Sequence, residues 1–315
     1  MRAIAIVAGL LGLAGCASDP ALPPPLTTAA EAGVLAFETA GSLERTGRRA
    51  YSPAAPVRIA GELRFPEGTG PFPAIVLAHG CGGNRRIEGA WGAVLRGWGY
   101  ATFVLDSFSS RGLREVCTQG IALVPLQRVP DAYGALRLLA AHPRIDPRRI
   151  ALMGFSHGGA LTMLASTAWA KDTYAPAGQP SFRAFFPFYP NCNARFPERS
   201  RVSAPVRIHT GAADDWTPAK PCAELAASLK AAGQDVGIDV YPGAHHAFDQ
   251  ARGYNYLPKV GNGSGCFPVM ASILGPVVSG AGAGCVRRGA TIAPNPEAAA
   301  QARRNLQAQL ATLLR

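Results

Sequence analysis

The sequence feature that most constrains the fold is residues 150–159, where an apolar run ends abruptly in glycines. Residues 150–153 predict a buried strand and residues 160–165 predict a helix. Between them lies Gly154-Phe155-Ser156-His157-Gly158, a G-x-S-x-G pattern. Side chains at positions 154 and 158 would crowd the backbone of so sharp a turn. The pattern therefore predicts a strained turn that presents Ser156 at the end of a strand, beside the free N–H groups of a helix. Taken alone, it could also be a glycine-rich turn with an idle serine.

Apolar runs alternate with helical periodicity along most of the chain. We expect strands at residues 57–65, 74–78, 100–105, 182–189, 206–209 and 236–241, the first of them at a sheet edge. We expect helices at residues 90–98, 129–141 and 218–231, and from Pro296 to Leu314 behind an Asn295 N-cap. This alternation predicts the α/β class, with a mostly parallel central sheet and helices on both faces. Sites in such sheets form at the carboxyl ends of the strands.

Residues able to activate Ser156 follow two of the later strands. A serine hydroxyl needs a base to take its proton, and that base needs an acid to orient it. The acid candidates are Asp214 and Asp215, and the base candidates are His245 and His246. The order serine, acid, histidine is that of the α/β-hydrolase fold. Spacing alone does not choose within either pair, because a shift of one residue reverses the direction of a side chain on an extended segment.

The chain resembles the dienelactone hydrolase family of the α/β-hydrolases over roughly residues 55–250 and the last helix. The resemblance rests on four motifs: His79-Gly80, the pattern at 154–158, Gly211-x-x-Asp214, and His246-Ala-Phe248. It implies an α/β-hydrolase fold with Ser156, Asp214 and His246 as catalytic residues. Asp215 is then a solvated neighbour and His245 a loop histidine. The family's namesakes carry a cysteine nucleophile, so Ser156 favours a more general serine esterase.

Two backbone amides are candidates for the oxyanion hole. His157 follows the serine directly, and Cys81 lies in the turn after the strand at 74–78. Cys81 is not expected to be a nucleophile, because the motif order supplies it with no base. Arg111 follows the strand at 100–105, so it is expected at the same rim. It either binds a substrate carboxylate or holds loop carbonyls, and the sequence does not decide between these roles.

The first residues resemble a bacterial lipoprotein signal. Arg2 precedes an apolar run that is too short to span a bilayer, and small residues lead to Cys16. We expect residues 1–15 to be removed, Cys16 to be lipidated, and the protein to be exported to the cell envelope, facing the periplasm or the exterior. Residues 16–35 are expected to be a proline-rich tether to one domain at 36–315. Without the signal, 30 Lys and Arg face 20 Asp and Glu, without a basic block or a nucleic-acid motif.

Six cysteines remain after Cys16, an even number that suggests disulfides in an exported chain. From their places in the predicted elements we expect the pairs Cys81–Cys117, Cys192–Cys222 and Cys266–Cys285. The last pair would close a glycine-rich insertion at about residues 251–293, which shows no regular pattern. We see no zinc-type spacing, so no metal or cofactor is predicted.

Together these features predict an exported serine hydrolase that cleaves small carboxylic esters or lactones through an acyl-Ser156 intermediate. A peptidase or a polyester depolymerase could use the same three residues. A non-catalytic binding lipoprotein is the alternative from another class; it is the weaker one, because all three triad residues persist.

Overall fold

The computed structural model describes residues 32–315 apart from 48–49, 84–85, 252, 281 and 283. The predicted signal peptide, Cys16 and most of the predicted tether lie outside the described residues. A central sheet of eight strands has the order β1-β4-β6-β5-β7-β8-β9-β10. Their bounds are β1 Gly33–Glu38, β4 Arg58–Arg64, β6 Ala101–Asp106, β5 Phe72–Ala78, β7 Ile145–Phe155, β8 Ala184–Phe188, β9 Val206–Gly211 and β10 Val236–Tyr241. From β6 to β10 neighbouring strands are parallel, while β1 and β4 are antiparallel additions.

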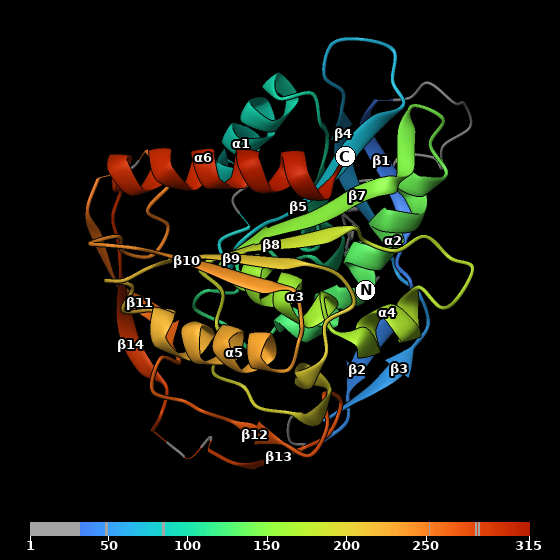
Figure 1. Cartoon of the computed structure of the whole chain (residues 1–315). Helices are drawn as coiled ribbons and strands as arrows, with labels where there is room; N and C mark the ends of the chain where they lie inside the picture. The colour runs from blue at the N-terminus through green and yellow to red at the C-terminus, as the bar shows by residue number, and fades with distance from the viewer. Residues whose placement is uncertain (1–31, 48–49, 84–85, 252, 281, 283) are drawn as a thin grey trace, which may run out of the picture.

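Helices cover both faces of this sheet (Figure 1). On one face lie α2 (Val129–Ala140), α3 (His157–Ala165), α4 (Ala168–Tyr174) and α5 (Ala219–Ala231), which share one core cluster with the sheet. On the other face lie α1 (Arg86–Gly97) and α6 (Pro296–Leu313), which share a second cluster. The central strands are buried on both faces, which explains their continuous apolar sequences. The predicted α/β class and helix placement are confirmed, including the Asn295 side chain that caps α6.

Two expectations about the sheet and the insertion were wrong. The strand predicted at 57–65 is not at the edge, because β1 pairs with it on the outer side. The insertion is not patternless either: β11 (Asn255–Asn262) pairs with β14 (Arg287–Ile292), and β12 (Val269–Met270) with β13 (Val277–Ser279). A further hairpin joins β2 (Ser42–Arg45) to β3 (Tyr51–Ala54). These short ribbons flank the helices that cover one face of the sheet (Figure 1).

The three predicted disulfides are present: Cys81–Cys117, Cys192–Cys222 and Cys266–Cys285. The first joins the loop after β5 to the loop after β6, and the second joins the loop after β8 to α5. The third closes the insertion. No helix within the described ranges is long and apolar enough to cross a bilayer.

Candidate active site

The turn between β7 and α3 has the strained geometry that the G-x-S-x-G pattern predicts. Ser156 has φ 54° and ψ −111°, a conformation that L-residues rarely adopt. A Cβ atom at Gly158 would collide with the carbonyl oxygen of Ala78, and one at Gly154 with the carbonyl oxygen of Gly158. The amide of Ser156 donates to the carbonyl of Phe188 at 2.9 Å, which fixes the turn against the next strand. The turn therefore presents a half-buried serine at the first residue before a helix.

Ser156, His246 and Asp214 form one continuous hydrogen-bonded chain. The Oγ of Ser156 lies 2.8 Å from Nε2 of His246, and Nδ1 of His246 lies 2.8 Å from Oδ2 of Asp214. Because a carboxylate only accepts, Nδ1 carries the proton and Nε2 accepts from the serine. The imidazole and the carboxylate are buried. This is the arrangement in which a histidine can take the proton of a serine hydroxyl.

The Asp214 carboxylate is held by its own loop. Its Oδ1 accepts hydrogen bonds from the amides of Trp216 at 2.9 Å and Thr217 at 2.8 Å, and its Oδ2 contacts the Thr217 hydroxyl at 2.9 Å. The Trp216 ring lies 4.9 Å from the His246 ring, and the ring of Tyr189 lies 4.8 Å from it on an edge. Hydrogen bonds from the loop therefore hold the Asp214 carboxylate in place, and two aromatic rings pack against the imidazole of His246.

The alternative residues in each pair have other partners. Asp215 is exposed, and its carboxylate accepts from the amide and the hydroxyl of Thr291, at 2.9 and 2.8 Å. It therefore anchors the returning strand of the insertion, a role beyond that of a solvated neighbour. The ring of His245 lies edge-on to Tyr254, 6.1 Å away.

The turn after β5 lies against the serine. The nearest atoms to a Cβ built on Gly80 are the carbonyl oxygen of Phe155 and the Cβ of Ser156, at 3.4 and 3.6 Å. Cys81 and His157 line the same cleft as Ser156, a cavity of about 700 Å³. The disulfide to Cys117 and a 2.7 Å hydrogen bond from the Val116 amide to the Cys81 carbonyl fasten this turn. Both candidate oxyanion donors are thus beside the nucleophile.

Arg128 is a site residue that the sequence analysis missed. It is fully buried at the end of η2 (Pro125–Arg128), where its Nη1 donates to the His79 carbonyl at 2.9 Å and to Nδ1 of His157 at 2.8 Å. The other ring nitrogen of His157 then donates to the Leu123 carbonyl at 3.0 Å. Burial, assisted by the Arg128 guanidinium, lowers the pKa of His157 well below 6.5. One arginine therefore connects the two segments that carry the candidate oxyanion amides.

Of the two roles expected for Arg111, binding a substrate carboxylate or holding loop carbonyls, its contacts agree with the second. Its guanidinium forms a fork with the buried carboxylate of Asp131, with N–O distances of 2.9 and 2.8 Å, and also donates to the Ser107 carbonyl at 2.7 Å. With its fork occupied, Arg111 is not presented to a substrate carboxylate. Among the described residues, no group of three or more His, Cys, Asp and Glu could hold a metal ion.

The strand order of the sheet, the strained turn at Ser156 and the hydrogen-bonded chain of Ser156, His246 and Asp214 together define an α/β-hydrolase. The model of the dienelactone hydrolase family matches residues 59–260, which is more than half of the chain. The chain belongs to the dienelactone hydrolase family, which supports hydrolase activity on ester bonds.

Solved structures agree with this fold. A putative dienelactone hydrolase from Klebsiella pneumoniae is 18% identical, with a TM-score of 0.56 over 88% of this chain and 98% of that one. Esterase 2 of Thermogutta terrifontis, phosphoramylated by tabun, is 20% identical, with a TM-score of 0.50 over 68% and 88% of the two chains. A search of curated proteins gave no significant match.

Proposed function

We propose that this protein is a serine hydrolase that cleaves carboxylic esters through an acyl-Ser156 intermediate. The observation that carries the proposal is the pair of 2.8 Å contacts from Ser156 Oγ to His246 and from His246 to Asp214. The Thermogutta terrifontis esterase 2 described above, which was phosphoramylated by tabun, is consistent with the proposal.

In the proposed mechanism, Ser156 Oγ attacks the ester carbonyl carbon while its proton moves to Nε2 of His246. Asp214 keeps the imidazole oriented and stabilises its positive charge. The amides of Cys81 and His157 donate to the oxyanion. When the intermediate collapses, the carbon–oxygen bond to the alcohol breaks and His246 returns the proton to the leaving oxygen. A water molecule, deprotonated by His246, then attacks the acyl carbon; the bond from that carbon to Ser156 Oγ breaks, His246 returns the proton to Oγ, and the carboxylic acid leaves.

A fluorophosphonate probe tests whether Ser156 is activated. We expect the parent to be labelled and to hydrolyse p-nitrophenyl acetate, and Ser156→Ala to do neither while keeping the parent's circular dichroism. Ser228→Ala, which changes an exposed serine of α5, is the matched control and should be labelled like the parent. Labelling of Ser156→Ala at the parent's rate contradicts the proposal. Amide and polymer substrates in the same assay separate an esterase from a peptidase or a polyester depolymerase.

We also propose that the protein is exported and held to a membrane by a lipid on Cys16. The signal-like residues before Cys16 and the three disulfides of the described domain support this proposal. Mass spectrometry of the mature native chain should find an acylated Cys16 at its amino end, and Cys16→Ser should no longer partition into detergent. An unmodified cysteine at this position contradicts the proposal.

A further inference from the structure

A second cavity, of about 400 Å³, adjoins the catalytic cleft. Four residues line both: Ile121, Pro125, Ala160 and Asn191. Ala160 lies one helical turn beyond the nucleophile on α3, where its amide donates to the Ser156 carbonyl at 2.8 Å. The second cavity therefore begins one turn from the serine and continues along α3 and past its end to Thr167.

The walls of this cavity are mainly apolar side chains that are only partly covered by the core. Five of them come from four different segments: Met163, Leu164, Phe196, Leu225 and Met270. All but Met270 pack against the main core cluster with one side. Their remaining surface lines the cavity, where an apolar ligand would remove it from water.

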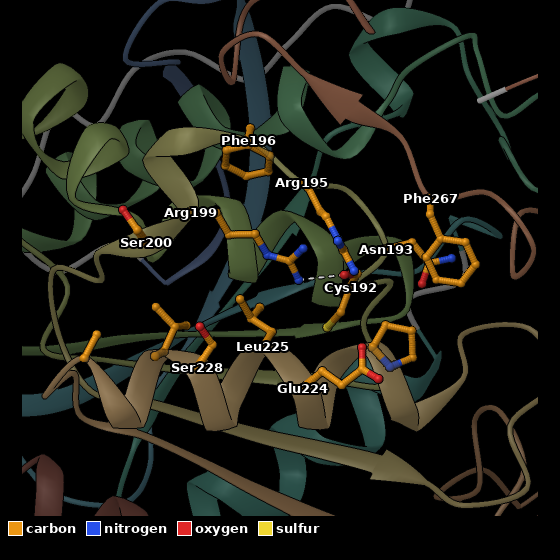
Figure 2. A pocket seen from close by; sticks show the side chains of 13 residues that line it. Cys192, Asn193, Arg195, Phe196, Arg199, Ser200, Glu224, Leu225, Ser228 and Phe267 are labelled. Atoms are coloured by element: carbon orange, nitrogen blue, oxygen red, sulfur yellow. Dashed lines mark hydrogen bonds between the residues drawn. The ribbon is translucent and has the colours of Figure 1, made fainter. Parts of the chain in front are cut away.

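Four polar side chains of the wall are bonded to backbone carbonyls. The hydroxyls of Ser166 and Thr167, just beyond the end of α3, donate to carbonyls of the last turn of that helix at 2.8 Å. Arg45 donates to the Ile121 carbonyl at 2.9 Å. Arg199 also lines a neighbouring pocket, drawn in Figure 2, where it donates to the Cys192 carbonyl; it donates to the Ala194 carbonyl as well. With these groups bonded to backbone, the cavity favours hydrocarbon over a polar ligand.

Segments outside the region matched by the family model close the cavity. Pro268 and Met270 of the insertion exchange backbone hydrogen bonds of 2.8 Å with Arg195. The amide of Tyr51, on the β2–β3 hairpin, donates to the Leu274 carbonyl at 2.9 Å. The family model matches residues 59–260, so this part of the wall lies outside the matched region.

We propose that this cavity binds the acyl chain of the ester, so that the substrates are esters of medium-length, apolar carboxylic acids. The inference rests on the proposed esterase function. Trp216 and Thr217, which contact His246 and Asp214, line the catalytic cleft rather than the apolar cavity. The leaving alcohol must lie near His246 to receive its proton, which leaves the apolar cavity to the acyl side. From Ala160 on α3 to Thr167, two residues beyond the end of α3, the chain advances roughly 10 Å at about 1.5 Å per residue, which is the reach of about eight extended carbons.

A series of p-nitrophenyl esters from acetate to dodecanoate tests this proposal. We expect kcat/KM to rise about threefold to fourfold for each methylene up to about octanoate, and then to level off or fall. A parallel series of acetate esters with lengthening alcohols should show no such rise. A chain-length preference that follows the alcohol, or none at all, overturns the assignment.

Two neighbouring valines of β13 give a matched pair of variants. Val277 lines the cavity, whereas Val278 is 63% exposed. Val277→Trp should lower kcat/KM for octanoate at least tenfold and leave acetate within twofold, and Val278→Trp should change neither. Met163→Ala, which enlarges the cavity from α3, should move the optimum to longer chains. Equal losses on acetate and octanoate with Val277→Trp contradict the proposal.

Failure of the esterase function would give a different result. In that case the parent would hydrolyse neither acetate nor octanoate and would not react with the fluorophosphonate. A parent that is labelled and hydrolyses acetate, but without any gain from longer acyl chains, overturns the acyl pocket alone. As a measurement independent of turnover, octanoate should raise the melting temperature of Ser156→Ala, and acetate should not.

Discussion

At the scale of single residues, the two adjacent aspartates have different tasks. Asp214 contacts His246, whereas Asp215 bonds to Thr291 of the insertion. Asp214→Asn should lower kcat by about 10³–10⁴-fold, because the amide favours the wrong tautomer of His246. Asp215→Asn should keep kcat within a few-fold and lower thermal stability slightly. Steady-state kinetics of both variants check the assignment, and a greater loss of kcat in Asp215→Asn reverses it.

Arg128 is expected to act as a positioning residue. Arg128→Met removes the donor that joins the His79 carbonyl to the His157 ring, so the two candidate oxyanion amides lose their common support. We expect kcat to fall about tenfold to a hundredfold with little change in KM. Arg137→Met, which loses a hydrogen bond to Tyr174 on the same face of the sheet, is the control. If Arg128→Met only melts earlier and retains the parent's kcat at low temperature, its role is structural.

What the sequence could predict at this scale depended on local pattern. Ser156 and its glycines form one continuous motif, and family motifs selected Asp214 and His246 from their neighbours. Arg128 carried no signal, because its role arises from contacts with residues 49 and 29 positions away. Arg111 was expected in the correct loop. Its partner Asp131 lies on α2, and the sequence contains no motif that would predict contact between this helix and the loop.

At the scale of elements, the strands and helices of the sheet were predictable because each has a clear period. The short strands of the insertion were missed, because β12 and β13 are only two and three residues long and β11 and β14 mix glycine and polar residues without a regular period. Their order comes from tertiary pairing and from the Cys266–Cys285 bond. The edge strand β1 was missed because residues 33–35, its first three, were assigned to the predicted tether at 16–35.

The disulfide of the insertion should matter more for substrate choice than for the sheet. It closes a loop of 19 residues, which contributes about 3 kcal/mol by restricting the unfolded chain. The Cys266→Ser/Cys285→Ser double variant should therefore lose activity on octanoate more than on acetate, with the far-ultraviolet circular dichroism unchanged. Mild reduction of the parent should likewise lower activity before the core unfolds. Unfolding of the sheet at the same reductant concentration as the loss of activity contradicts this expectation.

At the scale of the whole molecule, buried neutral histidines make stability depend on pH. His209 is buried between β9 and α6, where Nδ1 lies 2.7 Å from the Tyr241 hydroxyl and Nε2 lies 3.0 Å from Oε1 of Gln309. Burial lowers its pKa to about 4, against the opposing effect of the Asp239 carboxylate 3.6 Å away. Burial also lowers the pKa of His157. Asp249 has the opposite effect on stability. Burial raises its pKa, so its protonated form is favoured in the fold and its contribution to stability increases as the pH falls.

The sign of the histidine contribution follows from proton uptake. Below about pH 6.5 the unfolded chain protonates these histidines and the folded chain does not, so the stability they contribute is complete above pH 7 and is lost as the pH falls towards 4. His209→Gln removes one titrating group. Between pH 7.5 and 4.5, its free energy of unfolding should fall by about 2 kcal/mol less than that of the parent. Urea titrations at both pH values measure this difference, and equal losses in the two proteins would show that His209 has the same pKa in the folded and the unfolded chain.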